Sequence, residues 1–252
     1  MSGHSKWANI KHRKGAADAR KGRAFSRLAK EIMISARVGG GDISANARLR
    51  TALAAARNAN VPKDNVERAI KKGTGEIAGG QIEELTYEGY GAGGAAILVE
   101  CATDNRNRTA SEIRMLFDRN NGVLAGSGAV TWMFKRKAHL VVTGEAADEN
   151  RLMELLIDAG VEDIEVEDGS ADIWGPPDSL EALGAALAKA GIKAEETALA
   201  QRPDNYVDVT DRDIARQLIR LVEKLEDHDD VQGVHSNFDI SAAILQELSA
   251  DE

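Results

Sequence analysis

Basic side chains crowd near the start of the chain, where they could neutralise a polyanion. Nine lysine and arginine residues, one histidine and one tryptophan lie between positions 6 and 30. Lysine and arginine bind phosphates and release the counterions condensed on nucleic acid, which gives affinity without reading the base sequence. We therefore predict nucleic-acid binding by Lys6, Trp7, Lys11, His12, Arg13, Lys14, Arg20, Lys21, Arg23, Arg27 and Lys30.

The tryptophan within this basic run has two interpretations. Trp7 could stack on an unpaired base, because every base offers a π face to an aromatic ring. It could equally pack against the helices that follow, as large apolar rings commonly do. The residue types support both interpretations.

The net charge of −9 conceals a strong asymmetry along the chain. Residues 1–72 contain 17 Lys and Arg against 5 Asp and Glu, a net charge of +12. Residues 73–252 contain the other 15 Lys and Arg and 36 Asp and Glu, a net charge of −21. Such a division is typical of a basic module that binds a polyanion, joined to acidic domains. Uneven sampling of a solvated surface is the plainer alternative.

The remaining polar residues do not form the pattern of a catalytic or metal site. Ser127 lies between two glycines, but no histidine and carboxylate pattern accompanies it to activate a nucleophile. The run from Asp227 to Asp230 is either a solvated loop or a weak divalent-cation site, and we favour the solvated loop. We predict no catalytic residue, no metal, no cofactor, no small-molecule substrate and no enzymatic activity.

The segment from Gly89 to Gly94 matches the pattern GxGxxG of dinucleotide-binding loops. That function requires the glycines to follow a strand and to open a helix. Here strand-like sequence stands on both sides, so we predict a hairpin turn.

Cysteine content and hydropathy predict a cytoplasmic protein. The single cysteine, Cys101, cannot form an internal disulfide, and its apolar neighbours predict a buried structural thiol. The N-terminal segment is basic but lacks the apolar core of a secretory signal. No stretch approaches the roughly 18 consecutive apolar residues of a membrane span, so we expect no membrane partner.

Helical periodicity dominates the first part of the chain. Apolar residues recur at helical spacing over about residues 25–36, and the glycines at 39–41 end this predicted helix. We expect an alanine-rich helix over about residues 45–58 and a third helix over about 62–73, with Pro62 in its first turn.

Strand and helix patterns alternate after residue 82. The stretches ELTYEGY, AAILVECAT and GAVTWMF predict strands, and residues 107–120 predict a helix. Over residues 137–202 the predicted order is β-α-β-β-α-β, the ferredoxin-like signature. A last strand-helix-strand unit follows, and Thr210 with Asp213 resembles a capping box at the start of its helix.

These patterns predict an α+β fold of three domains. An N-terminal three-helix domain precedes two α+β (ferredoxin-like) domains, one inserted in the other. The predicted bounds are 1–78 for the basic helical nucleic-acid-binding domain, 79–135 plus 204–240 for a discontinuous middle domain, 136–203 for the ferredoxin-like domain, and 241–252 for a C-terminal tail. Insertion is favoured because strands before 136 and after 204 could complete one sheet. Three domains in succession are the alternative.

Several motifs resemble the YebC family, and together they extend over essentially the whole chain. They are GHSKWANIKHRKGAADARKGRAFSRLAKEI, GGGDISANARLR, NVPKDNVERAIKKGTGE, LTYEGYGAGGAAILVECATDNRNRT and DDVQGVHSNFD. The resemblance implies a three-domain α+β protein with a helical N-terminal domain, and it supplies no catalytic residues. It also implies regulation: some bacterial members are described as DNA-binding transcriptional regulators. Other members, and the mitochondrial member that activates cytochrome oxidase translation, act on the ribosome, notably where proline runs stall it.

Two functions fit the basic segment. The favoured one is a DNA-binding transcriptional regulator that holds duplex DNA against the helical domain, with Asn46, Arg48 and Arg50 as candidate base readers. The alternative is a ribosome-associated translation factor that binds ribosomal or transfer RNA through an arm and loops fitted to an irregular shape. A metal-dependent enzyme is a third hypothesis, which no motif supports.

Overall fold

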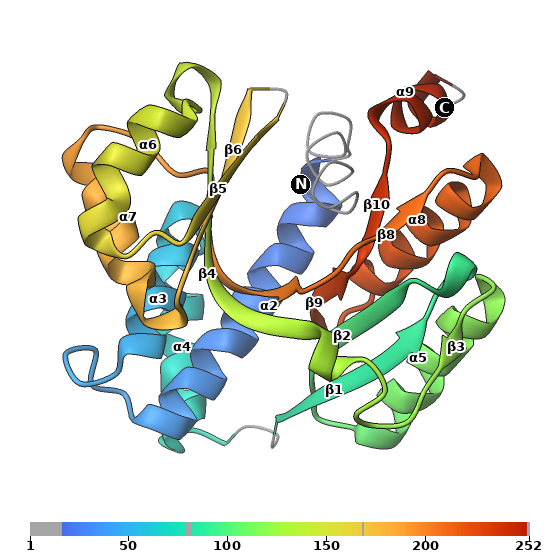
Figure 1. Ribbon diagram of the computed structural model, residues 1–252. Helices are drawn as coiled ribbons and strands as arrows, with labels where there is room; N and C mark the ends of the chain where they lie inside the picture. Colours follow the sequence, from blue (N-terminus) through green and yellow to red (C-terminus); the bar gives the residue numbers. More distant parts are fainter. Residues whose placement is uncertain (1–16, 79–81, 168, 251–252) are drawn as a thin grey trace.

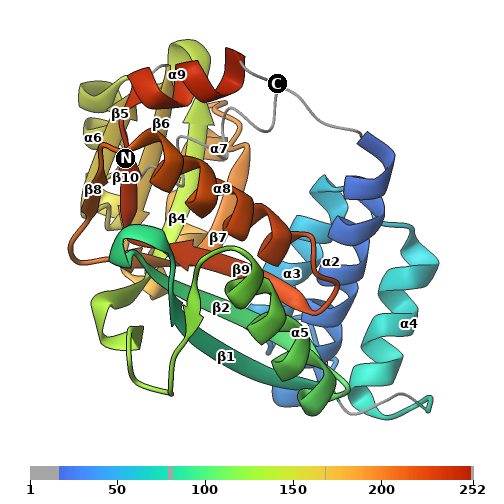
Figure 2. The same cartoon turned by 90° about the vertical axis from the view of Figure 1, so that its right-hand side faces the viewer.

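The computed structural model describes residues 17–78, 82–167 and 169–250. Its first part is helical, and it leads into two separate four-stranded sheets with their own helices (Figures 1 and 2). This is the predicted α+β class. Among the described residues, no helix combines the length and apolar character needed to cross a membrane.

Three helices form the N-terminal part. They are α2 (Ala17–Gly39), α3 (Ala47–Asn58) and α4 (Lys63–Thr74). The predicted helix over 25–36 is therefore the middle of a longer one. Small side chains let the three helices approach closely: Ala36, Ala52, Ala56 and Ala69 are buried around Ile32 and Leu49.

The middle sheet is built from distant parts of the sequence. Its strand order is β3-β1-β2-β9, so a strand from near the C-terminus pairs with β2. The strands are β1 (Glu83–Tyr90), β2 (Ala96–Thr103), β3 (Val123–Leu124) and β9 (Val231–Ser236). One face packs against α5 (Arg106–Arg119) and α8 (Arg212–Glu226), and α9 (Ala242–Ala250) packs beside α8 (Figure 2). The predicted C-terminal tail thus includes a helix whose Leu245 and Leu248 are buried in this core.

The third part has the predicted β-α-β-β-α-β order. Its elements are β4 (Phe134–Thr143), α6 (Glu149–Leu156), β5 (Asp163–Glu167), β6 (Ser170–Gly175), α7 (Leu180–Lys189) and β7 (Glu196–Pro203). The antiparallel sheet has the order β5-β6-β4-β7, and α6 and α7 bury their leucines on one face. On β4 and β6, His139 Nε2 lies 2.6 Å from Asp172 Oδ1, and the His139 ring stacks on Trp174 at 4.1 Å.

Short elements complete the fold. The parallel pair β8 (Val207–Val209) and β10 (Phe238–Ile240) lies beside α8 and β9. The 3₁₀ helices are Ala92–Gly94, Thr131–Met133, Gly144–Ala146, Ile157–Ala159 and Pro177–Ser179. The chain therefore leaves the middle part at β4 and returns after β7, which supports the proposed insertion of residues 136–203.

Two local predictions need correction. The stretch GAVTWMF is not a strand: residues 131–133 form a 3₁₀ helix, and strand β4 begins only at Phe134. The helix α8 is capped by Asp211, whose carboxylate accepts from the N–H groups of Asp213 and Ile214 at 2.8 and 3.0 Å. Thr210 is therefore not the capping residue.

Two other predictions are confirmed. The glycine-rich segment joins antiparallel strands β1 and β2, with Tyr90 opposite Ala96, so it is a hairpin connection. Cys101 lies in the core at 2% exposure, and burial raises the pKa of its thiol to about 12. A thiol that stays protonated at neutral pH is a poor nucleophile.

The contact between α2 and α4 leaves no room for a side chain at Gly73. A Cβ there would lie 2.4 Å from the Met33 carbonyl oxygen and 2.8 Å from Ala36 Cβ. We predict that Gly73→Ala lowers the free energy of unfolding by about 1–3 kcal/mol, because the helices must separate. Urea unfolding followed by circular dichroism measures this.

Gly22→Ala is the matched control, because a Cβ on this glycine of α2 would meet nothing within 4 Å. Alanine is the better helix former by roughly 0.5–1 kcal/mol, so this change should not destabilise. Equal losses of stability in both variants would contradict the packing argument.

Candidate nucleic-acid interface

The beginning of α2 lies against the last residue of α8 and the loop that joins α8 to β9, here together called the acidic loop (residues 226–230). Arg23 Nη2 lies 3.0 Å from Asp227 Oδ1. The Arg27 guanidinium donates to the carbonyl oxygen of Glu226. Two of the predicted nucleic-acid-binding residues therefore also attach the helical part to the middle part.

Lys30 extends deeper into the same contact. Its Nζ lies 2.8 Å from Asp230 Oδ1, and it donates to the carbonyl oxygens of Asp229 at 2.9 Å and Ala102 at 3.1 Å. A lysine whose three donor positions are satisfied in this way offers little to a phosphate. We therefore assign Lys30 mainly to interdomain contact.

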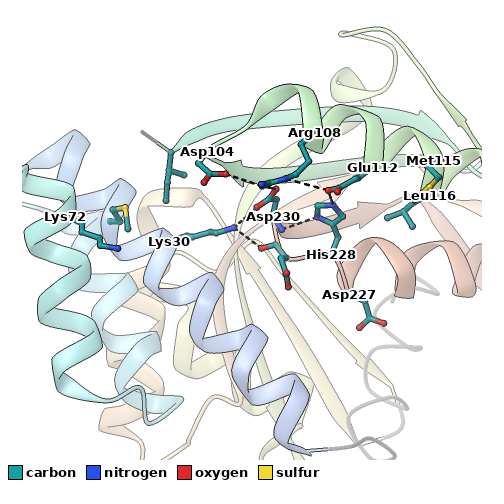
Figure 3. Close-up of a pocket in the computed structure, with 13 residues that line it drawn as sticks. Lys30, Lys72, Asp104, Arg108, Glu112, Met115, Leu116, Asp227, His228 and Asp230 are labelled. Carbon is teal, nitrogen blue, oxygen red and sulfur yellow. Dashed lines mark hydrogen bonds and ion pairs between the residues drawn. The ribbon is translucent and has the colours of Figure 1, made fainter. Parts of the chain in front are cut away.

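Asp230 is the centre of this contact (Figure 3). Its Oδ2 accepts from Arg108 Nη2 at 2.7 Å, Thr109 Oγ1 at 2.8 Å and Thr103 Oγ1 at 3.1 Å. Burial alone would raise the pKa of Asp230, but hydrogen bonds from Lys30, Arg108 and Thr109 outweigh it and hold this pKa below its ordinary value. The interpretation of a solvated loop is wrong for this residue, which is only 5% exposed.

Glu112, His228 and Asp230 bring ligand atoms within 4.8 Å of one another, as a metal site would. Their atoms are already engaged. His228 Nε2 lies 2.9 Å from Glu112 Oε2, while its Nδ1 accepts from the Asp230 N–H at 3.1 Å. A divalent cation would have to displace Lys30 and Arg108 from Asp230, so we interpret the cluster as structural.

A pocket of about 770 Å³ opens between α2, α4 and α5 beside this cluster (Figure 3). Lys30 and Lys72 line one side, and Arg108 and Glu112 line another. Its cations and carboxylates are interleaved, so it has no single sign of charge with which to attract a polyanion.

The candidate base readers of α3 are occupied within the protein. Arg48 forms hydrogen bonds with Glu31 at 2.8 and 3.0 Å and with Glu84 at 2.6 and 3.2 Å. Hydrogen bonds with Glu31 and then Glu84 raise the pKa of Arg48. This arginine therefore joins α2, α3 and β1.

Asn46 and Arg50 are also engaged. The Asn46 side chain caps α3 by accepting from the Leu49 N–H at 3.0 Å, and it donates to the Ser35 carbonyl at 2.8 Å. Arg50 Nε lies 3.1 Å from Glu181 Oε1 of α7. These contacts account for all three polar side chains that the sequence offered for reading bases.

A basic surface that sequence reasoning missed lies on α4. Arg68, Lys71 and Lys72 stand at i, i+3 and i+4, so they share one side of the helix. Within the described ranges, none of the three has an ion-pair partner, and Arg68 and Lys71 are exposed. We call these residues the α4 basic face. The helical periodicity together with the net charge of residues 1–72 was the signal that could have found it.

The rest of the predicted site lies mostly at the N-terminal end. Lys6, Trp7, Lys11, His12, Arg13 and Lys14 fall outside the described residues. Arg20 and Lys21 belong to the first turns of α2 by their backbone. The structure thus locates part of the predicted set at the acidic loop and leaves the remainder as a prediction.

Family models match nearly the whole chain. Residues 5–76 match the model described as the TACO1/YebC protein N-terminal domain. Residues 82–238 match the model described as the TACO1/YebC second and third domain. The chain belongs to the TACO1/YebC family.

Relatives within the YebC family extend over the full chain. A probable transcriptional regulatory protein of Desulfotalea psychrophila is 50% identical over 249 residues, covering 99% of this chain and all of that protein. One from Desulfatibacillum aliphaticivorans is 51% identical, covering 95% and 97% of the two chains. The crystal structure of a conserved hypothetical protein from Aquifex aeolicus has a TM-score of 0.87 at 42% identity, covering 96% and 99%. The predicted family and α+β fold are confirmed, and the relatives' names support a regulatory role of the YebC type.

The pairing of Asp230 predicts how stability depends on pH. Asp230→Asn leaves Lys30 and Arg108 without their shared counterion, and breaking a buried pair costs about 3–5 kcal/mol. The pKa of Asp230 lies below its ordinary value of 3.8 when folded, so the unfolded chain takes up the proton first. This stabilisation is therefore complete above about pH 5 and is lost as the pH falls below about 4.

Urea unfolding of wild type and variant between pH 3 and pH 7 tests this prediction. The difference in unfolding free energy should narrow as the solution becomes acidic. Asp229→Asn is the control, because that exposed side chain should contribute no more than about 0.5 kcal/mol. A constant difference across this pH range would contradict a charged role for Asp230.

Proposed function

We propose that this YebC-family chain is a nucleic-acid-binding regulatory factor of the cytoplasm, without enzymatic activity. The observation that carries the proposal is the net charge of +12 in residues 1–72 together with an α4 basic face that has no carboxylate partner among the described residues. Cations without internal partners can exchange counterions for phosphates. The acidic domains then serve as the frame that holds the helical domain.

Structured RNA is the target that the described residues favour. A protein that reads duplex DNA places a helix in the major groove, with several side chains free to contact base edges. On α3, Asn46 and Arg48 are engaged internally, which weakens that use of the helix. Arg50, by contrast, forms an exposed ion pair with Glu181. Phosphate contacts from α4 and from an N-terminal arm suit ribosomal or transfer RNA, whose irregular shape is recognised without base readout. Relief of stalling at proline runs is the role that the family resemblance attaches to such a target.

Duplex DNA is the second candidate. It is supported by the names of the relatives, each a probable transcriptional regulatory protein. Crosslinking the protein to nucleic acid in cells and sequencing what is recovered distinguishes the two. Recovery of ribosomal or transfer RNA supports the first target, recovery of promoter DNA supports the second, and recovery of neither contradicts the proposal.

The α4 basic face provides a direct test. The triple variant R68Q/K71Q/K72Q should bind a structured RNA at least tenfold more weakly, which is about 1.4 kcal/mol. The slope of log affinity against log salt should also become shallower, by about one unit for each phosphate that the variant no longer binds. A filter-binding titration from low to physiological salt measures both.

The matched control is R151Q/K189Q/K193Q, which removes three exposed cations from the ferredoxin-like part. Because both triple variants change the net charge equally, any difference between them reports position rather than total charge. Equal affinity of the two variants for the RNA would show that the α4 basic face is not part of the binding site.

Substitutions in the basic N-terminal arm (residues 6–14) should differ in effect from substitutions of the cations that contact the acidic loop. Replacing Lys6, Lys11, Arg13 and Lys14 by Gln should weaken binding at least tenfold on unrelated sequences, since phosphate contacts carry no sequence information. The melting temperature should stay nearly unchanged, because surface substitutions alter stability by about 0.5 kcal/mol or less. By contrast, Arg27→Gln and Lys30→Gln should lower the melting temperature, because those side chains hold the acidic loop. A large fall in the melting temperature of the arm variant would show instead that the arm stabilises the fold.

A further inference from the structure

Trp132 is a large aromatic side chain that the fold leaves uncovered. It is 68% exposed, whereas Trp174 is 7% exposed. Tryptophan is highly buried on average, because its ring carries a large apolar surface. Its exposure on a part of the chain that is otherwise acidic calls for a physical explanation.

The loop that presents Trp132 is held firmly in place. The Glu88 carboxylate, 4% exposed, accepts from the N–H groups of Gly128 at 2.7 Å, Val130 at 2.7 Å and Thr131 at 2.9 Å. Burial would raise the pKa of Glu88, but these backbone donors lower it, so the group is a carboxylate at neutral pH. The backbone that leads into the exposed ring is therefore fixed before any partner arrives.

The neighbours of Trp132 point the other way. Val130 and Phe134 are buried against Ala96 and Leu98, on the face of the middle sheet that α5 and α8 do not cover. Val130 and Phe134 of this loop thus pack on the sheet, whereas Trp132 faces the solvent. The indole N–H of Trp132 donates to the Ala129 carbonyl oxygen at 3.1 Å, so the ring's one polar group is already satisfied.

The surrounding sequence suits a polyanion. Residues 119–144 contain no Asp or Glu, but they contain Arg119, Lys135, Arg136 and Lys137. Residues 73–252 as a whole carry a net charge of −21, so this run of 26 residues with a charge of +4 is exceptional. Lys135 and Lys137 pair with Asp204 and Glu162, whereas Arg136 is exposed and forms no ion pair within the described chain.

We infer that Trp132 is a stacking platform for an unpaired base of the nucleic acid, forming a second contact site remote from the helical domain. This inference rests on the proposed nucleic-acid function and adds a preference for single-stranded segments. Every base has a π face, so such a platform binds an unpaired base with little regard to its identity. A base within a duplex is already stacked on both faces, so the platform offers it nothing.

A nucleic-acid occupant fits this surface better than a second protein does. Interfaces between proteins surround an aromatic anchor with contacts that exclude water. Here the chain after the ring continues through Met133 and the buried Phe134 to the exposed cation Arg136, and the ring is preceded by the exposed Gly126–Gly128 segment. Cations and exposed polar backbone within a few positions of an exposed aromatic ring are the elements that bind a strand with its phosphates and bases.

The two contact sites lie far apart on one frame. The β3–β4 connection, which contains residues 125–133, and α4 lie on opposite sides of the view in Figure 2. A nucleic acid that reaches both gains affinity from linkage, because the second contact forms at a high effective concentration. Substitutions on the α4 basic face should therefore change the salt dependence of binding, whereas substitutions of Trp132 should change the affinity for unpaired bases.

Fluorescence anisotropy with the full-length protein tests the inference. The probes are a labelled 20-nucleotide oligoadenylate and a fully paired RNA duplex of the same length. We expect Trp132→Ala to weaken oligoadenylate binding about tenfold, leave duplex binding unchanged and leave the salt slope unchanged, because stacking releases no counterions. Trp132→Phe should restore most of the affinity. Ile157→Ala, which truncates another exposed apolar side chain at 64% exposure, should have no effect.

The other outcomes are distinct. If wild type binds both probes and Trp132→Ala matches it on oligoadenylate, the stacking site is wrong while the proposed function stands. If Trp132→Ala and Trp132→Phe lose binding to both probes and melt early, the ring serves the fold and the inference fails. If Trp132→Ala binds RNA normally but abolishes self-association of the wild type in sedimentation, the surface belongs to a second copy. If wild type binds neither probe, the proposed function itself fails.

Discussion

Burial of the Asp230 carboxylate imposes the strongest constraint on how the parts of this molecule sit together. A buried carboxylate costs several kcal/mol unless opposite charge and hydrogen bonds compensate it. Compensation comes from three directions: Lys30 of α2, Arg108 and Thr109 of α5, and Thr103 at the end of β2. Because Lys30 belongs to the helical part, the carboxylate is fully paired only when α2 is docked. The position of the helical domain is therefore set by electrostatics as much as by apolar packing.

The cations around this contact differ in what they can also do. Arg23 pairs with Asp227 through side chains that are 34% and 47% exposed, and exposed pairs contribute only about 0–1 kcal/mol. A phosphate could replace such a partner at little cost to stability. Lys30 and Asp230 have side chains that are 21% and 7% exposed, so the same exchange would leave a buried carboxylate without one of its two cations. Along one helix, the cation nearer the N-terminus is thus better suited to binding and the later one to folding.

Sequence patterns predicted the elements better than they predicted the contacts. Periodicity located α3, α4 and the β-α-β-β-α-β unit, because each pattern arises within a few turns or one strand. The partners of Asp230 stand up to 200 positions away, so nothing near it in sequence distinguished a buried hub from a solvated loop. The stretch GAVTWMF has the β-branched and aromatic residues of a strand, but its backbone donors bind Glu88, about 40 residues earlier. This tertiary contact overrides the local pattern. The predicted binding residues of α2 likewise reach partners far along the chain, which composition alone does not reveal.

The connection between the two sheets bears on how the α4 basic face and the Trp132 loop could bind one partner together. The chain enters the third part at Phe134 and leaves it at Pro203, and these residues face each other on adjacent antiparallel strands. Beside them, Glu100 of β2 accepts from Gln201 of β7 at 3.0 Å and lies 3.3 Å from His235. Burial raises the pKa of Glu100, but the hydrogen bond from His235 and other contacts lower it to about 2, so the group stays charged and the junction stays paired at neutral pH. Two paired strands, with the half-buried Glu100 carboxylate joined to both sheets, resist bending far better than a single linker would. The two acidic domains are consequently held rigidly to each other. The helical part that contains α4 is docked on them through Lys30 and Asp230, and Glu88 holds the Trp132 loop, so the two sites keep a fixed separation. A fixed separation favours simultaneous binding of partners whose shape already matches it.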